Sequence, residues 1–232
     1  MYAHFFKRAI DLILSLIALL VLSPILLLLT VIGAIAMGGN PFFTQMRPGK
    51  ISKKTGKEKI FRLIKFRTMS NKRDKDGNLL PDDVRLNKYG RILRSTSLDE
   101  LPELINIFKG DMAIVGPRPQ LVRDMTFMSD EQRRRHTVRP GLTGLAQVNG
   151  RNNITWEQKF EYDLQYVEKG ITFFRDLKII FSTVGKVLKR SDTVREGTVS
   201  DMDFGDWLLA EGKVDDETYQ LKQQAARELL KL

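Results

Sequence analysis

The sequence predicts an α+β protein that is mostly helical, with an N-terminal membrane segment in front of a compact domain that has a small β component. Three observations predict this class. Residues 12–37 carry no charge, residues 42–69 hold two stretches of strand-like alternation, and helical periodicity dominates the rest of the chain. A length of 232 residues suits one domain with an appendage. We therefore expect an anchor over residues 1–40, a central domain over 41–196 and an acidic helical appendage over 197–232.

The composition restricts the chemistry that the chain can perform. It contains no cysteine, which excludes disulfides, thiolate metal sites and a cysteine nucleophile. Its two histidines, His4 and His136, argue against a histidine-rich metal site or a Ser-His-Asp triad. The formal net charge is +10, and the excess lies in residues 41–95, which hold 16 basic and 5 acidic side chains. Acid–base or nucleophilic steps must therefore use carboxylates, lysine, tyrosine, serine or threonine.

Residues 12–37 predict a membrane segment with a break in its middle. A straight helix of these 26 residues would reach roughly 39 Å, more than the ~30 Å hydrocarbon core of a bilayer. Pro24 cannot donate to the carbonyl of Leu20 and disfavours helical backbone at Ser23, so we expect a kink there. Basic residues flank both ends, and the positive-inside rule keeps basic flanks in the cytosol. The residues alone leave two alternatives: a kinked span, or a re-entrant hairpin whose ends stay on one side.

Alternation of apolar and polar residues predicts short strands after the anchor. Residues 42–45 are expected to form the first strand, followed by a turn at residues 47–49. Residues 60–69 are expected to form the second strand, with one wet and cationic face. Residues 70–88 contain Lys-Asp-Gly-Asn and Pro-Asp-Asp and predict a long loop. Residues 112–115 complete the small β component with a further short apolar strand.

The next segment predicts a helix from Ser97 to Phe108. Ser97 and Glu100 have the spacing of a capping box, in which each side chain bonds the backbone of the other residue. Pro102 would then lie in the first turn, where proline is best tolerated, and Gly110 would follow the last turn.

The C-terminal half predicts further helices. Residues 156–167 form one, and residues 171–190 form a basic amphipathic stretch. A stretch of that kind can lie in a membrane interface, or pack against a core with its basic face in water. Residues 197–232 are acidic and predict a helical hairpin that turns near Gly212.

Asp99 and Glu100 are the strongest candidates for chemistry. In a first helical turn, free N–H groups and the helix dipole would lower the pKa of both carboxyls and keep them ionised. An ionised aspartate can be a nucleophile or bind Mg²⁺ through oxygen. The alternative is that the pair only caps the helix, because acidic residues are preferred in first turns.

Cationic side chains around this pair indicate an anionic substrate. Guanidinium groups bind phosphates with two parallel hydrogen bonds, and an ammonium group adds charge. The candidates are Lys65, Arg67, Arg94, Arg118 and Arg151. Each could instead be solvated or paired with a carboxylate. Nucleic acid is another reading of the basic block, but its position beside the apolar segment favours anionic lipid headgroups, and no phosphate-binding P-loop motif is present.

Several motifs in one order resemble the bacterial sugar transferases, in particular the small monotopic phosphoglycosyl transferases. The resemblance covers roughly residues 1–195 and rests on KFRTM at 65–69, TSLDELP at 96–102, GDM at 110–112, VGPRP at 115–119 and RPGLTG at 139–144. The sequences NGRN at 149–152 and FEYD at 160–163 resemble the members that start bacterial N-linked protein glycosylation. The acidic tail has no counterpart in these motifs, and no catalytic role is carried onto it.

The resemblance implies a reaction and a set of roles. A UDP-sugar, which we expect to be N-acetylated, would give its phosphosugar to undecaprenyl phosphate, with UMP as the second product. Asp99 would attack the β-phosphate, form a covalent phosphosugar intermediate and hold the required Mg²⁺. Glu100 would give acid–base help or position other groups, while the family residues that match Lys65, Arg94, Arg118 and Asp163 bind phosphate or shape the site.

The resemblance also implies a location and partners. It favours the re-entrant hairpin and places the enzyme on the cytoplasmic face of the bacterial inner membrane, at the first membrane step of glycoconjugate or exopolysaccharide assembly. A second copy of the chain or downstream glycosyltransferases are open as partners, and nucleic acid is not expected. Two alternatives stay open: direct transfer without a covalent intermediate, and a membrane-anchored basic adaptor that binds anionic lipid or nucleic acid.

Overall fold

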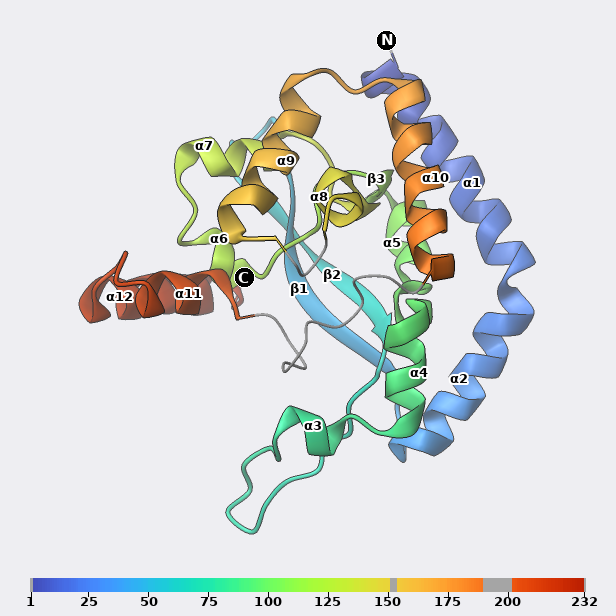
Figure 1. Cartoon of the computed structure of the whole chain (residues 1–232), viewed down its shortest axis with the longest axis vertical. Helices are drawn as coiled ribbons and strands as arrows, with labels where there is room; N and C mark the ends of the chain where they lie inside the picture. Colours follow the sequence, from blue (N-terminus) through green and yellow to red (C-terminus); the bar gives the residue numbers. More distant parts are fainter. Residues whose placement is uncertain (1, 151–153, 190–201, 232) are drawn as a thin grey trace.

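The computed structural model describes residues 2–150, 154–189 and 202–231. Figure 1 shows the bent N-terminal helices along one side of the molecule and the C-terminal helices projecting from the opposite side. The helical elements are η1 (Tyr2–Phe6), α1 (Lys7–Val21), α2 (Ser23–Met37), α3 (Asp82–Arg85), α4 (Lys88–Thr96), η2 (Leu98–Glu100), α5 (Glu103–Lys109), α6 (Val122–Met125), α7 (Asp130–Arg133), η3 (Arg134–Thr137), α8 (Leu145–Val148), α9 (Trp156–Glu168), α10 (Phe173–Lys189), α11 (Phe204–Ala210) and α12 (Asp216–Leu229). The mostly helical class predicted from the sequence is confirmed.

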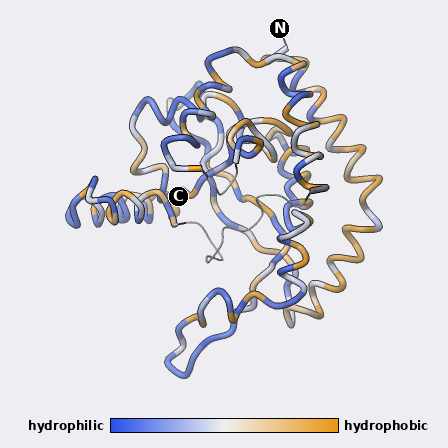
Figure 2. Tube along the Cα trace, in the orientation of Figure 1, coloured by the Kyte–Doolittle hydropathy of each residue, from blue (hydrophilic) through white to orange (hydrophobic). Residues whose placement is uncertain are grey.

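The N-terminal pair α1–α2 is bent by 63° at Leu22, which confirms the predicted break beside Ser23 and Pro24. The hydroxyl of Ser23 donates to the carbonyl of Leu20 at 2.8 Å, a carbonyl that Pro24 cannot bond. Among the described helices, none alone has the length and hydropathy of a bilayer span, although the bent pair does by length and composition. Figure 2 shows that hydrophobic residues are concentrated along both helices.

The two-stranded sheet of β1 (Phe42–Ile51) and β2 (Glu58–Phe66) is antiparallel, and Phe42 lies opposite Phe66. The predicted turn at residues 47–49 is wrong, because β1 continues through it. Pro48 and Gly49 instead lie where the register shifts, and proline is tolerated at such an irregularity. Gly49 allows close approach, since a Cβ there would lie 2.8 Å from the carbonyl oxygen of Lys59.

A second, short sheet pairs β3 (Ala113–Val115) in parallel with β4 (Gly141–Thr143). The loop after β3 approaches the backbone before β4 so closely that a Cβ at Gly116 would lie 2.4 Å from the carbonyl oxygen of Arg139. This contact fixes the start of the loop that carries Arg118.

Helix α1 packs on the domain through a core and through charged contacts. Ala18 and Leu19 of α1, with Leu22 at the bend, pack against a buried cluster made of Phe61, Leu63, Leu104, Ile107 and Met112. At the start of α1, Lys7 pairs with Asp176 of α10 at 2.7 Å, and Arg8 donates to the carbonyl of Ile107 at 2.7 Å. The helix pair is therefore an integral part of the fold.

Helix α2 is held at its far end by α4. The hydroxyl of Tyr89 donates to the carbonyl of Leu29 at 2.9 Å, and the amide of Asn87 donates to the carbonyl of Ala36 at 3.1 Å. Both ends of the bent pair thus contact the same domain.

The C-terminal hairpin of α11 and α12 turns at Gly212, which has a φ of 66°, as predicted. Its Phe204 packs in a buried cluster with Met128, Trp156 and Phe160. Lys213 pairs with Glu157 of α9 at 2.7 Å. The appendage is therefore fixed to α9.

Candidate active site

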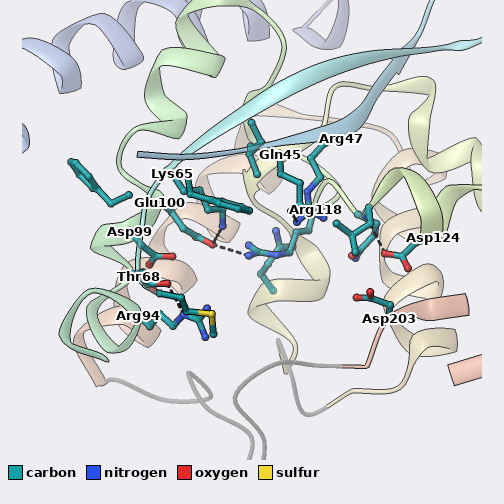
Figure 3. A pocket seen from close by; sticks show the side chains of 18 of the residues that line it. Gln45, Arg47, Lys65, Thr68, Arg94, Asp99, Glu100, Arg118, Asp124 and Asp203 are labelled. Atoms are coloured by element: carbon teal, nitrogen blue, oxygen red, sulfur yellow. Dashed lines mark hydrogen bonds and ion pairs between the residues drawn. The ribbon is translucent and has the colours of Figure 1, made fainter. Parts of the chain in front are cut away.

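A cavity of about 750 Å³ lies between the β1–β2 sheet, the turn η2, the loop that carries Arg118, and the start of α11 (Figure 3). Seven of the eight predicted site residues line it: Lys65, Arg67, Arg94, Asp99, Glu100, Arg118 and Asp163. The eighth, Arg151, lies outside the described residues. Residues from both halves of the chain therefore meet in one hollow.

The predicted helix start at Ser97 is wrong. Ser97 ends α4 in the left-handed conformation, with φ 56°, and its side chain does not cap a helix. The turn η2 follows it, and α5 begins only at Glu103. Pro102 has no N–H to donate, so the regular helical hydrogen bonds begin only after it. Asp99 and Glu100 therefore occupy a single 3₁₀ turn between two helices.

Glu100 is fully engaged by cations. Its Oε1 accepts from Lys65 Nζ at 2.9 Å and from Arg118 Nη2 at 2.7 Å. Burial alone would raise the pKa of Glu100, but the charges of Arg118 and Lys65 outweigh it and hold the pKa well below its usual range. Glu100 is therefore an ionised group whose Oε1 already accepts hydrogen bonds from two cations.

Asp99 lies next to Glu100 but differs from it in its hydrogen-bond partners and in the direction of its pKa shift. No described residue donates a hydrogen bond to its carboxylate or pairs with it, and the side chain lines the cavity. Burial and the negative charge of Glu100 raise the pKa of Asp99 to about 6, against the opposing charge of Lys65. The expected lowering of its pKa is thus wrong, because burial and the charge of Glu100 outweigh the cations nearby, and Asp99 lies in a three-residue 3₁₀ turn rather than at the start of a long helix.

Arg94 lies on the Asp99 side of the cavity. Its Nε donates to the hydroxyl of Thr68 at 3.1 Å, which fixes the guanidinium at the wall (Figure 3). Arg118 lies towards the middle of the cavity, between Asp99 and the opposite end. The two arginines therefore flank the region in front of the Asp99 carboxylate.

Asp163 supports the site through Arg135. Its side chain is 2% exposed and accepts from Arg135 Nε at 2.9 Å. The same guanidinium donates to the carbonyl of Arg118 at 2.6 Å. Asp163 therefore orients Arg135, which in turn holds the backbone of Arg118, and of the two roles expected for it the geometry matches site architecture.

The sequence did not single out several polar residues at the cavity or beside it, among them Arg47, Glu103 and Gln147. Arg47 donates to Gln45 Oε1 at 2.7 Å, and burial together with the charge of Arg118 lowers the pKa of Arg47 to about 10. The sequence could have indicated Arg47, because residues two apart in a strand lie on the same face, and Arg47 follows Gln45 by two residues. Glu103 lies 3.1 Å from Lys65, and burial and the charge of Glu100 raise the pKa of Glu103 to about 7. Nothing in its helical setting marked it out.

Gln147 of α8 is the third of these residues. It lines the cavity and is 8% exposed, and neither atom of its amide has a hydrogen-bond partner among the described residues. An unmatched buried polar group costs about 1–3 kcal/mol. The amide therefore has two N–H donors and one carbonyl acceptor that no described residue engages, at the border of the cavity.

The carboxylate of Asp99 fits a Mg²⁺ ion of one particular kind. Within the described part of the chain, no three acidic or histidine side chains cluster as a metal site. Mg²⁺, however, is usually held by one or two carboxylates together with substrate phosphates and waters. Asp99 suits that pattern because its oxygens face the cavity and are not engaged by neighbours. The residues present thus fit an ion that arrives with a phosphorylated substrate.

A carboxylate without a partner among the described residues, beside cations in a cavity, is an arrangement that suits group transfer on an anionic substrate. The chain belongs to the bacterial sugar transferase family, whose model matches residues 2–190. The family resemblance read from the sequence is therefore confirmed, and the matched region ends before the appendage.

Relatives support this assignment. The chain is 49% identical over 182 residues to an uncharacterized sugar transferase, EpsL, of Bacillus subtilis strain 168, covering 78% of this chain and 87% of that protein. It is 40% identical over 194 residues to a UDP-glucose:undecaprenyl-phosphate glucose-1-phosphate transferase of Klebsiella pneumoniae, covering 78% of this chain but 40% of that protein. It is 34% identical over 198 residues to the exopolysaccharide production protein ExoY of Rhizobium meliloti strain 1021, covering 78% and 84%. The finer resemblance to protein-glycosylation members stays a prediction.

Proposed function

We propose that this chain transfers a phosphosugar from a UDP-sugar to undecaprenyl phosphate, with UMP as the second product. The Klebsiella relative is named for a reaction of this type. The observation that carries the proposal is the contrast between two adjacent carboxylates: Glu100 is held by two cations, while Asp99 is open to the cavity.

In the first half of the proposed reaction, a carboxylate oxygen of Asp99 attacks the β-phosphorus of the UDP-sugar. The bond from that phosphorus to the bridging oxygen breaks, and UMP leaves with the electron pair. The product is an aspartyl phosphosugar. Arg118 and Lys65 lie where they can offset charge on the phosphoryl oxygens.

In the second half, a phosphate oxygen of undecaprenyl phosphate attacks the same phosphorus. The aspartyl–phosphorus bond breaks, the carboxylate of Asp99 is restored, and undecaprenyl diphosphosugar is formed. Two displacements at one phosphorus let the soluble donor and the lipid acceptor use the same cations in turn.

Glu100 acts in this scheme as a positioning residue. Its hydrogen bonds to Lys65 and Arg118 occupy its oxygen at 2.9 and 2.7 Å, and a strongly lowered pKa makes it a poor proton donor. These contacts support positioning over acid–base help.

Mg²⁺ would be held by Asp99 together with the donor diphosphate, where it would neutralise charge on the phosphoryl oxygens. Lys65 and Arg118 would bind the phosphate oxygens that the ion does not neutralise. Arg94 lines the cavity on the Asp99 side.

We also propose that α1–α2 is a re-entrant anchor in the cytoplasmic leaflet. Lys7 contacts α10 at one end of the pair, Asn87 contacts α2 at the other, and both partners belong to one domain. A true span would require that domain to lie on both sides of a bilayer. Because the chain has no native cysteine, Ala3→Cys and Asn40→Cys can each carry a single label. Labelling of both from the cytosol alone supports the hairpin, and labelling from opposite sides excludes it.

The transfer itself is tested with the full chain, Mg²⁺, undecaprenyl phosphate and a panel of UDP-sugars, with UMP and the lipid product measured. We expect turnover with at least one donor and a preference for an N-acetylated sugar. Release of UMP in the absence of lipid separates the covalent route from direct transfer. A chain that binds anionic vesicles but turns over no donor would be the membrane adaptor instead.

A further inference from the structure

The C-terminal appendage supplies part of the wall of the cavity. Met202 and Asp203, which lie beyond the region matched by the family model, line the same hollow as Asp99. We infer that this appendage builds the subsite for the nucleoside of the donor, with Met202 and Asp203 as its contact residues. The inference rests on the proposed function, because it assumes a nucleotide donor.

The appendage is fixed firmly enough to form a binding wall. Phe204 is buried against Trp156 and Phe160, with ring centroids 5.1 and 5.0 Å apart, and its N–H donates to Asp124 Oδ1 at 2.9 Å. Gly205 lies so close to Phe127 that a Cβ would approach its ring to 2.5 Å. Aromatic packing and a backbone hydrogen bond thus lock the residues that directly follow Met202 and Asp203.

The two wall residues are also tied to the domain directly. The indole Nε1 of Trp156 donates to the carbonyl of Met202 at 3.2 Å. Asp203 forms an ion pair with Arg123. A carboxylate has about four acceptor sites, and one guanidinium in a paired contact uses at most two of them. An oriented carboxylate therefore borders the cavity beside an apolar side chain that is 54% exposed.

The direction of the reaction decides which part of the donor lies there. In phosphoryl transfer the attacking and leaving oxygens lie roughly in line with phosphorus. Asp99 lies at one end of the cavity, Asp203 at the other, and Arg118 lies between them (Figure 3). With Asp99 as nucleophile and the phosphates at Arg118, the departing UMP points towards Asp203.

The chemistry of this end suits a nucleoside. A carboxylate accepts hydrogen bonds from ribose hydroxyls, as acidic residues do in other nucleotide sites. Met202 has the flexible, polarizable side chain that packs well on a flat ring. Trp156 and Arg47 complete the apolar and cationic borders of this end. The appendage therefore contributes ribose recognition through Asp203 and base contact through Met202.

The test uses two variants of the full chain, Met202→Ala and Asp203→Asn, with a matched control for each. Leu221→Ala removes an exposed apolar side chain of the appendage, 65% exposed against 54% for Met202, that does not line the cavity. Asp206→Asn changes a carboxylate of the appendage that accepts from Tyr219 and also lies away from the cavity. The probes are UMP and dUMP as inhibitors, measured with the KM values for donor and lipid.

We expect both wall variants to raise the donor KM and the inhibition constant of UMP by about 10-fold, the effect of losing roughly one good contact, with the lipid KM unchanged. Asp203→Asn should also reduce the preference for UMP over dUMP. Unchanged UMP inhibition in both wall variants would overturn the inference. So would a loss of kcat and thermal stability without any change in donor KM, which is what a purely structural role gives.

Direct calorimetry of UMP binding separates this inference from the proposed function. If the wild type binds UMP more tightly than the wall variants but transfers no phosphosugar, the proposed function fails and the subsite stands. If the wild type transfers phosphosugar while all four variants bind UMP equally, the subsite fails and the proposed function stands.

Discussion

The two ends of the cavity are built in different ways. At one end, Asp99 and Glu100 are neighbours in the chain, and the cations that pair with Glu100, Lys65 and Arg118, lie within the family-matched region. At the other end, the wall combines β1, α6 and α9 with an appendage that the family model does not cover. In the proposed reaction, the chemical step would thus depend on short motifs, while donor recognition would depend on segments distant in the sequence.

The difference suggests which end varies within a fold of this kind. A nucleophile and its cations must keep one geometry for any sugar, because the reacting phosphorus is the same. A wall that contacts the rest of the donor can come from any segment that reaches it. The predictions below test whether the two ends are separable in this way.

The largest effect is expected from Asp99→Asn. An amide keeps the shape of the side chain but is a much poorer nucleophile, so kcat should fall by at least about 10³-fold. Steady-state UMP release measures it, and thermal melting should change little. Asp111→Asn is the control, because the carboxylate of Asp111 pairs with the exposed Lys59 and does not line the cavity. Near-normal turnover in Asp99→Asn would show that Asp99 is not the nucleophile.

Arg118→Ala should have the next largest effect, because Arg118 lies between the two ends. Loss of one preorganised cation costs about 10²–10³-fold in kcat, and Arg118→Lys should recover only part of it because a lysine cannot bond two phosphate oxygens in parallel. Arg134→Ala, which breaks a surface pair with Glu168, is the matched control. Equal rates for the alanine variants of Arg118 and Arg134 would contradict the assignment.

Asp163→Asn probes the buried pair with Arg135 that holds the backbone of Arg118. It leaves the buried Arg135 without its counter-charge, and breaking a buried pair costs about 3–5 kcal/mol in the free energy of unfolding. Chemical denaturation measures this. Glu168→Gln removes the exposed partner of Arg134 and should change stability by less than about 1 kcal/mol. Similar changes in the free energy of unfolding for the two variants would mean that the Asp163–Arg135 pair does not stabilise the fold.

Glu58 gives the smallest effect and acts on stability alone. Hydrogen bonds from His136 and Arg133 outweigh burial and lower the pKa of Glu58 from its ordinary 4.5 to about 2. The unfolded chain protonates near 4.5, so this contribution is complete above that pH and disappears as the pH falls towards 2. Denaturation across this range should show a flatter acid loss in Glu58→Gln than in the wild type. Parallel curves would show that Glu58 has no such role.

Much of the cavity end that holds Asp99 and Glu100 could be predicted, because the sequence patterns that indicate it are local. The adjacent carboxylates and the Lys65 strand indicated the Asp99 end of the cavity. In the N-terminal helices, Pro24 likewise indicated the bend. The details that failed depend on neighbours distant in sequence. The start of the helix depended on Ser97 ending α4, and the pKa of Asp99 depended on burial against Glu100.

The far end could not be predicted for the same reason. Asp203 looked like one of many acidic residues in a tail, and only its pairing with Arg123 and the packing of Phe204 bring it to the cavity. No spacing rule connects residues 123 and 203. Long-range packing, rather than any local pattern, makes the appendage part of the site.

The covalent role of Asp99 is tested most directly by intact mass measurement of the full chain with Mg²⁺ and a UDP-sugar that it turns over, without lipid. We expect a mass increase equal to one phosphosugar, located on Asp99 by peptide mapping and removed when undecaprenyl phosphate is added. An enzyme that turns over with lipid but never gains this mass on the donor alone would contradict the account.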